Sequence, residues 1–201
     1  GYRAEMDAHA ASAVAAALGD LPLALHLAGS FLRRYRQIPV AAYLDQLRTA
    51  LIRHPSLQGR GVERSPTNHE LDVARTFALS YDQLQPDDPV AATARALFAR
   101  AACLAPRVPK PRDLLLATLE LPADEFDAQL RAEDGLQRLS ELGLLEQETD
   151  NALRLHRLIA AYALSVSDAT EAREAVERAV IALVQQTIQE NTALYLSLRP
   201  L

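Results

Sequence analysis

Hydrophobic residues recur every three or four positions along most of this 201-residue chain, which is the spacing of a single buried face on an α-helix. Breaks at Gly19, at Pro39 and at Pro86–Pro89 separate successive periodic stretches. The pattern therefore predicts a mainly α protein. The predicted helices cover 4–18, 22–35, a stretch after Pro39, a stretch through 71–84, 90–104, 111–119, 124–142, 158–166 and a stretch after 168.

The segment Gly19–Pro22 is expected to join the first two helices. Gly19 suits the left-handed residue that follows a helix. Asp20 can cap the next helix with its carboxylate. Pro22 fits the first turn of that helix, where no amide hydrogen is needed. Residues 1–58 are therefore predicted to form a small helical bundle.

The hydrophobic period changes to two near residue 144. Leu144–Glu148 and Ala152–His156 have the alternation of two short strands around a turn at 149–151. Three helices followed by a β-hairpin is the order of a winged helix. Residues 69–167 are therefore predicted to form a winged-helix domain.

A segment rich in Gly, Ser and Pro, 59–68, is the predicted linker between these two parts. Thr67 and Glu70 have the spacing of a capping box at the start of the next helix. Residues 168–201 are predicted to begin a C-terminal helical region. Its expected apolar face holds Val176, Val180, Leu183, Val184 and Ile188.

The composition limits where the protein functions and what it binds. Hydrophobic residues make up 49% of the chain, the formal net charge is −5, and Cys103 is the single cysteine. A lone cysteine cannot form an intramolecular disulfide, and no signal peptide opens the chain, so a cytoplasmic protein is predicted. Polar residues interrupt the apolar stretch Ala10–Leu32, which predicts a helical hairpin rather than a membrane span. Gly1 is expected to mark a cut into a longer chain.

The motifs of autonomous catalysis are missing from the sequence. It holds neither the phosphate-binding pattern G-x-x-x-x-G-K-[ST] nor the dinucleotide pattern G-x-G-x-x-G. No pair of histidines has zinc-ligand spacing, and no carboxylate pair stands out as a general acid and base. We therefore predict neither catalytic residues nor a metal site, and the chain is not expected to be an enzyme by itself.

The predicted third helix of the winged helix, 124–142, carries six acidic residues against two arginines, a net charge of −4. Phosphate neutralisation supplies most non-specific affinity for DNA. DNA binding through this segment is therefore disfavoured, and a winged helix that contacts protein is the preferred interpretation.

Three motifs stand in a definite order. They are GDLPLAL at Gly19–Leu25, FALSYDQL at Phe77–Leu84 and LRLHRLI at Leu153–Ile159. Over residues 5–165 the chain resembles NB-ARC (STAND, AP-ATPase-like) signalling ATPases, from their small helical domain through their winged-helix domain. Segments of that family carry a G-L-P-L-A-L element, an S-Y-D-x-L helix and a terminal M-H-D element.

The resemblance implies a bound ADP or ATP that is shared with an upstream nucleotide-binding domain of the same chain. Pro22 and Leu23 would contact that nucleotide, Ser80 would lie near its phosphates, and His156 and Arg157 would stand at its other side. ADP would hold the molecule closed, and exchange for ATP would release the winged helix. The fragment would then be the regulatory, autoinhibitory part of an ATPase switch, with the Walker motifs upstream.

Elementary chemistry supports the expected roles of two of these residues, Pro22 and His156. Pro22 has no amide hydrogen, so its flat ring can pack on a nucleobase or ribose without stranding a donor. His156 directly precedes a predicted helix, whose first amides form a natural anion site. Arg157 stands where the family has Asp. It either adds positive potential beside a phosphate or pairs with a carboxylate of another domain.

The C-terminal segment resembles the start of the helical region that follows the winged helix in bacterial members, where tetratricopeptide-like repeats are common. The implied partners are the upstream domain, downstream helical repeats, and further copies of the protein in an active homo-oligomer. Two other functions stay open. One is a winged-helix DNA-binding transcription regulator with a helical dimerisation module, and the other is a helical adaptor that binds proteins.

Overall fold

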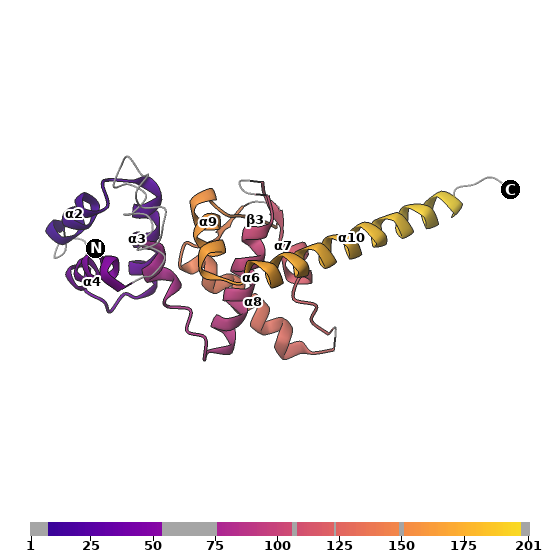
Figure 1. Ribbon diagram of the computed structural model, residues 1–201, viewed down its shortest axis with the longest axis horizontal. Helices are drawn as coiled ribbons and strands as arrows, with labels where there is room; N and C mark the ends of the chain where they lie inside the picture. The colour runs from indigo at the N-terminus through magenta and orange to yellow at the C-terminus, as the bar shows by residue number, and fades with distance from the viewer. Residues whose placement is uncertain (1–7, 54–75, 106–107, 123, 149–150, 198–201) are drawn as a thin grey trace.

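The first part of the chain is a unit of three helices in the computed structural model (Figure 1). They are α2 (Ala8–Ala17), α3 (Pro22–Arg34) and α4 (Val40–Arg53). The rings of Tyr35 and Tyr43 pack on Phe31, with centroids 4.9 and 5.0 Å away. The structure describes residues 8–53, 76–105, 108–122, 124–148 and 151–197. The predicted linker 59–68 and the capping box at Thr67 and Glu70 lie outside these residues.

The turn between α2 and α3 confirms the role of Gly19 and corrects that of Asp20. Gly19 has a left-handed backbone (φ 61°), and the amide of Asp20 donates to the carbonyl of Ala15 at 3.0 Å, as in a Schellman motif. Asp20 is itself left-handed (φ 54°), whereas a capping residue is extended. Leu21 takes the N-cap position without a side-chain hydrogen bond, and Pro22 is the first helical residue.

The second part has the order of elements of a winged helix and confirms the predicted mainly α fold (Figure 1). Residues 76–81 are helical and precede it. Its elements are α6 (Pro89–Cys103), β1 (Lys110–Pro111), α7 (Arg112–Ala117), α8 (Phe126–Glu141), β2 (Glu146–Gln147), β3 (Ala152–Arg154) and α9 (Arg157–Val166).

The small sheet has three antiparallel strands in the order β1-β3-β2. β2 and β3 form the predicted hairpin, in which Glu146 is aligned with Arg154. β1 was not predicted, and it pairs Lys110 with Leu153 on the other side of β3. Lys110 is the single lysine of the chain, and its buried ammonium donates to the carbonyl of Ala105 at 3.1 Å. Burial lowers the pKa of Lys110.

Helix α6 is the centre of the second part, and α8, α9 and the C-terminal helix pack on it. Gly135 of α8 allows a close approach, because a Cβ there would lie only 3.2 Å from the backbone nitrogen of Ala94. Phe77 stacks on Tyr162 of α9, with ring centroids 5.5 Å apart. Burial of alanines along α6 lets these helices approach closely.

The C-terminal helix α10 (Ala169–Ser197) is only half covered. Asp168 caps it by accepting the amide of Thr170 at 2.9 Å. Its first turns bury Ala172, Ala175 and Ala179. Beyond that point the helix projects away from the body (Figure 1). Large apolar residues are exposed along the projecting part, which we name the α10 stripe: Val180, Ile181, Leu183, Val184 and Ile188.

In the described part of the chain, no helix combines the length and the apolar character that crossing a membrane requires.

Candidate site at the junction of α3 and the winged helix

Helix α3 begins with the two residues predicted to contact a nucleotide. Pro22 is exposed at the first helical position, as expected for a ring that starts a helix. Leu23 is half-buried and packs against the hydrophobic core. The pyrrolidine of Pro22 is therefore accessible, whereas Leu23 mainly holds the start of the helix in place.

The same helix meets the winged helix at Gly143, directly after α8. Gly143 has a left-handed backbone (φ 73°). A Cβ on Gly143 would lie 2.9 Å from Oγ of Ser30 and 3.3 Å from Cδ2 of His26. Glycine is therefore required twice, once by the backbone conformation and once by the close approach of α3.

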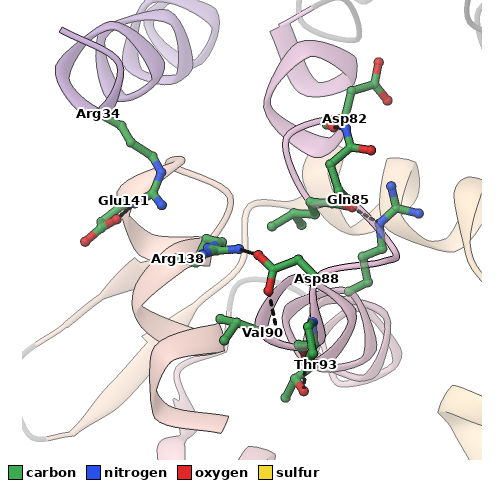
Figure 2. A network of polar contacts seen from close by, with 11 residues as sticks. Arg34, Asp82, Gln85, Asp88, Val90, Thr93, Arg138 and Glu141 are labelled. Carbon is green, nitrogen blue, oxygen red and sulfur yellow. Dashed lines mark hydrogen bonds and ion pairs between the residues drawn. The ribbon is translucent and has the colours of Figure 1, made fainter. Parts of the chain in front are cut away.

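Ion pairs flank this contact (Figure 2). Arg34 at the end of α3 pairs with Glu141 at the end of α8. One turn earlier on α8, Arg138 pairs with Asp88, whose carboxylate also accepts the amide of Val90 at 2.9 Å and so caps α6. The hydrogen bond from Arg138, with a smaller contribution from the Val90 amide, lowers the pKa of Asp88 against the opposing effect of burial. These pairs fix the end of α8 relative to both α3 and α6.

His156 was predicted to end the second strand of the wing. In the structure β3 ends at Arg154, and His156 is the N-cap of α9. Its Nδ1 accepts the amide of Leu158 at 3.2 Å. Nδ1 can accept this bond only when it is unprotonated, which leaves Nε2 as the ring nitrogen able to donate. Arg157 is exposed at the first position of α9. A donor imidazole, a guanidinium and the positive end of a helix dipole therefore stand together, which favours an anion.

The hairpin of β2 and β3 connects the Gly143 turn to the start of α9. Glu146 is aligned with Arg154 in the hairpin of β2 and β3, and His156 follows the end of β3 by two residues. Gly143, which contacts α3, is the residue before Leu144. On α3, Pro22 and His26 are four positions apart and so lie on one face. Helix α3 therefore contacts the turn that leads into β2, and β2 pairs with the strand that precedes α9.

Ser80 does not lie at the surface with the other predicted site residues. It lies in the helical segment 76–81, is fully buried (0% exposed), and its Oγ has no hydrogen-bond partner among the described residues. Contact between Ser80 and a phosphate would require the surrounding helices to move.

Two residues of the junction were not among the predicted site residues. They are His26 on α3 and Gly143 after α8. The position of His26 four residues after Pro22 was a usable signal, because that spacing puts both on one helical face. Contact with Gly143 had no local signal, since it joins residues far apart in the sequence.

Among the described residues, no group of three or more His, Cys, Asp or Glu side chains could hold a metal ion. A scan against protein-family models and searches of curated proteins and solved structures find no match to this chain.

Proposed function

We propose that this chain is the nucleotide-state-sensing part of a cytoplasmic signalling ATPase of the NB-ARC or STAND type, contributing ADP contacts and autoinhibition but no catalysis. One observation carries the proposal. The helix that begins at Pro22 packs on the Gly143 turn, and that turn leads into β2, which pairs with β3, the strand that precedes the N-cap residue His156. A nucleotide at this junction would contact both parts of the chain.

The chemistry of the two sides supports a nucleoside diphosphate. Pro22 offers an exposed apolar ring to a base or ribose. His156 and Arg157 offer donors to a phosphate at the start of α9. ADP bound to both sides would favour the docked arrangement by its differential affinity, typically about 1–3 kcal/mol of coupling. The Walker residues would come from an upstream domain, which is the partner that the proposal requires.

The α10 stripe supports the expectation of a downstream helical partner. A helix with a long exposed apolar face normally buries that face against other helices. We therefore include tetratricopeptide-like helices after α10, and a homo-oligomer in the ATP state, in the proposed arrangement.

A titration with a fluorescent ADP analogue tests the proposal on the 201-residue chain. One charge-assisted hydrogen bond contributes about 1.5–3 kcal/mol. A millimolar dissociation constant already corresponds to about 4.1 kcal/mol. The chain alone should therefore bind ADP more weakly than about 1 mM and should not turn over ATP. Tight binding or turnover would contradict the assignment.

The second test uses the full-length protein with the P-loop domain that the resemblance implies. It should co-purify with ADP, and His156→Ala should lower the ADP content and raise basal signalling. Arg173→Ala, on the exposed side of α10, is the matched control and should leave the ADP content unchanged. An unchanged ADP content in His156→Ala would show that His156 does not contact the nucleotide.

The order of elements also fits a DNA-binding regulator, which is the second candidate. Charge argues against it, because Asp124, Glu125, Asp127 and Asp134 are all exposed at or near α8. A gel shift with duplex DNA at low salt distinguishes the two functions, and salt-sensitive binding would favour the regulator.

A further inference from the structure

The outward face of α8 carries an apolar pair that no described element covers. Phe126 is 72% exposed and Leu130 is 48% exposed. They are four positions apart and so lie side by side on the helix. Glu133, Gln137 and Glu141 continue the same outward face toward the end of α8, opposite the buried residues of the helix. We name these five residues the α8 face.

A cavity of about 480 Å³ lies at the other end of the α8 face. Glu133, Gln137 and Glu141 line it from α8, Arg33 from α3 and Arg112 from the start of α7. Glu133 and Glu141 are neutralised there, because they pair with Arg112 and Arg34. The ion pair of Arg34 and Glu141 is visible at this end of the helix (Figure 2). The α8 face therefore runs from an exposed apolar pair to a polar hollow large enough for a side chain.

The two ends of the α8 face differ in charge. Around the apolar pair, Asp124, Glu125, Asp127 and Asp134 are exposed, and Arg131 is the one basic residue in the described stretch 124–134. None of these four carboxylates has an ion-pair partner within the described part of the chain. The apolar end is thus surrounded by negative charge that the described residues leave unneutralised.

We propose that the α8 face binds a positively charged amphipathic helix of a partner protein. The apolar side of that helix rests on Phe126 and Leu130, its Lys or Arg residues face the surrounding carboxylates, and one polar side chain enters the cavity. Exposed aromatic residues are the usual anchors of such contacts, and charge complementarity selects the partner and the orientation. The geometry is that of helix-on-helix peptide recognition. This inference does not depend on the proposed nucleotide contacts.

Two synthetic peptides test the proposal on the 201-residue chain. Each is about 18 residues long, enough to span α8 at 1.5 Å per residue. The first combines Leu at i, i+4, i+7 and i+11 with Lys and Ala, and the second has Glu at every Lys position. Fluorescence anisotropy should show the basic peptide binding at least about tenfold more tightly, with an affinity that falls as salt rises.

Variants locate the binding surface. Phe126→Ala should weaken the basic peptide at least about tenfold. It should leave the circular dichroism unchanged, because the side chain is mostly in solvent. Replacing Asp127 and Asp134 with Asn should flatten the salt dependence. Val108→Ala is the matched control, since Val108 is 54% exposed and lies outside both α8 and α10, and it should leave binding unchanged.

Three results would overturn the proposal. The first is equal affinity for the basic and acidic peptides. The second is an unchanged affinity in Phe126→Ala, or an equal loss in Val108→Ala, either of which would show that the peptide does not bind at the α8 face. The third is tighter binding of a DNA duplex than of the basic peptide, which would make the α8 face a nucleic-acid surface.

Discussion

The winged helix contacts α3 before it and α10 after it, and the two contacts are made of different chemistry. Helix α3 meets it at the Gly143 turn, beside the ion pair of Arg34 and Glu141. Helix α10 meets it through alanines buried against α6, among them Ala172 and Ala175. The α3 contact combines a glycine turn and an ion pair with a shared hydrophobic core, and the α10 contact is made of closely packed alanines.

This difference indicates which contact can open. Separating α10 from α6 would expose apolar surface, at about 25 cal/mol per Å². Separating α3 from Gly143 would return the side chains of Arg34 and Glu141 to water, a partly exposed pair that contributes little net stability, and would also expose part of the core that α3 shares. In the proposed switch, the nucleotide would therefore control the α3 contact, whereas α10 would move with the winged helix as one body.

The largest expected effect is that of Gly143→Ala. Left-handed backbone costs an Ala roughly 1–2 kcal/mol, and overpacking against Ser30 adds about 1–3 kcal/mol. Urea unfolding should show both losses. Gly19→Ala is the matched control, because Gly19 has the same left-handed backbone in the turn between α2 and α3, and it should show the first loss only. Equal losses in the two variants would mean that the approach of α3 to Gly143 adds nothing.

At the α10 contact, Ala175→Leu should cost about 1–3 kcal/mol by overpacking. Ala175 is 0% exposed, so the larger side chain has no space without moving α10 away from α6. Ala182→Leu, an exposed alanine two turns later, should change stability by less than about 0.5 kcal/mol. If Ala175→Leu behaved like Ala182→Leu, the α10 contact would be as loose as the α3 contact.

Local signals in the sequence predicted most of the helices, because they act over a few neighbouring residues. Gly19 ended α2 and Pro22 began α3 for the predicted reasons. The capping role of Asp20 was wrong because its own backbone is left-handed. Strand β1 was missed because two residues have no periodicity, and only pairing with β3 defines them.

The candidate site was predicted less completely, for a physical reason. Pro22 and His156 could be chosen from their local motifs, and both have chemistry suited to the predicted roles. The contact of α3 with the winged helix at Gly143, by contrast, involves His26 and Ser30 and is set by the packing of α3. Such long-range contacts leave no local pattern. In the same way, the sequence predicted the apolar face of α10 but not that its burial would end at Ala179.

The ion pair at the α3 contact should give a smaller effect. Arg34→Ala should cost at most about 1 kcal/mol, and less in high salt. The comparison is Arg178→Ala, which breaks the more exposed pair of Arg178 on α10 with Glu120 in the turn after α7, where the side chains are 56% and 51% exposed. Double-mutant cycles in urea should give a larger coupling for Arg34 with Glu141 than for Arg178 with Glu120. The reverse order would mean that the ion pair of Arg34 and Glu141 does not stabilise the α3 contact.

Acid should weaken the end of α8 through Asp88. The hydrogen bond from Arg138 lowers the pKa of Asp88 in the folded state. Its contribution is therefore present above the ordinary carboxyl pKa of about 3.9, and it is lost as pH falls through the lowered folded value. Asp88→Asn should flatten this part of the stability profile. An identical acid profile in the wild type and in Asp88→Asn would show that the pair does not contribute.

The smallest expected effect separates the two halves of α10. Ile188→Gln should leave stability within about 0.5 kcal/mol of the wild type, because Ile188 is 59% exposed and makes no core contact to lose. Val176→Gln, on the same helix, should cost at least about 1 kcal/mol, because Val176 is 7% exposed and burial of the polar amide is unfavourable. Thermal unfolding of the two variants gives the comparison. A large loss in Ile188→Gln would mean that the α10 stripe is already covered in solution, by a second copy of the chain, and sedimentation at several concentrations would then show the assembly.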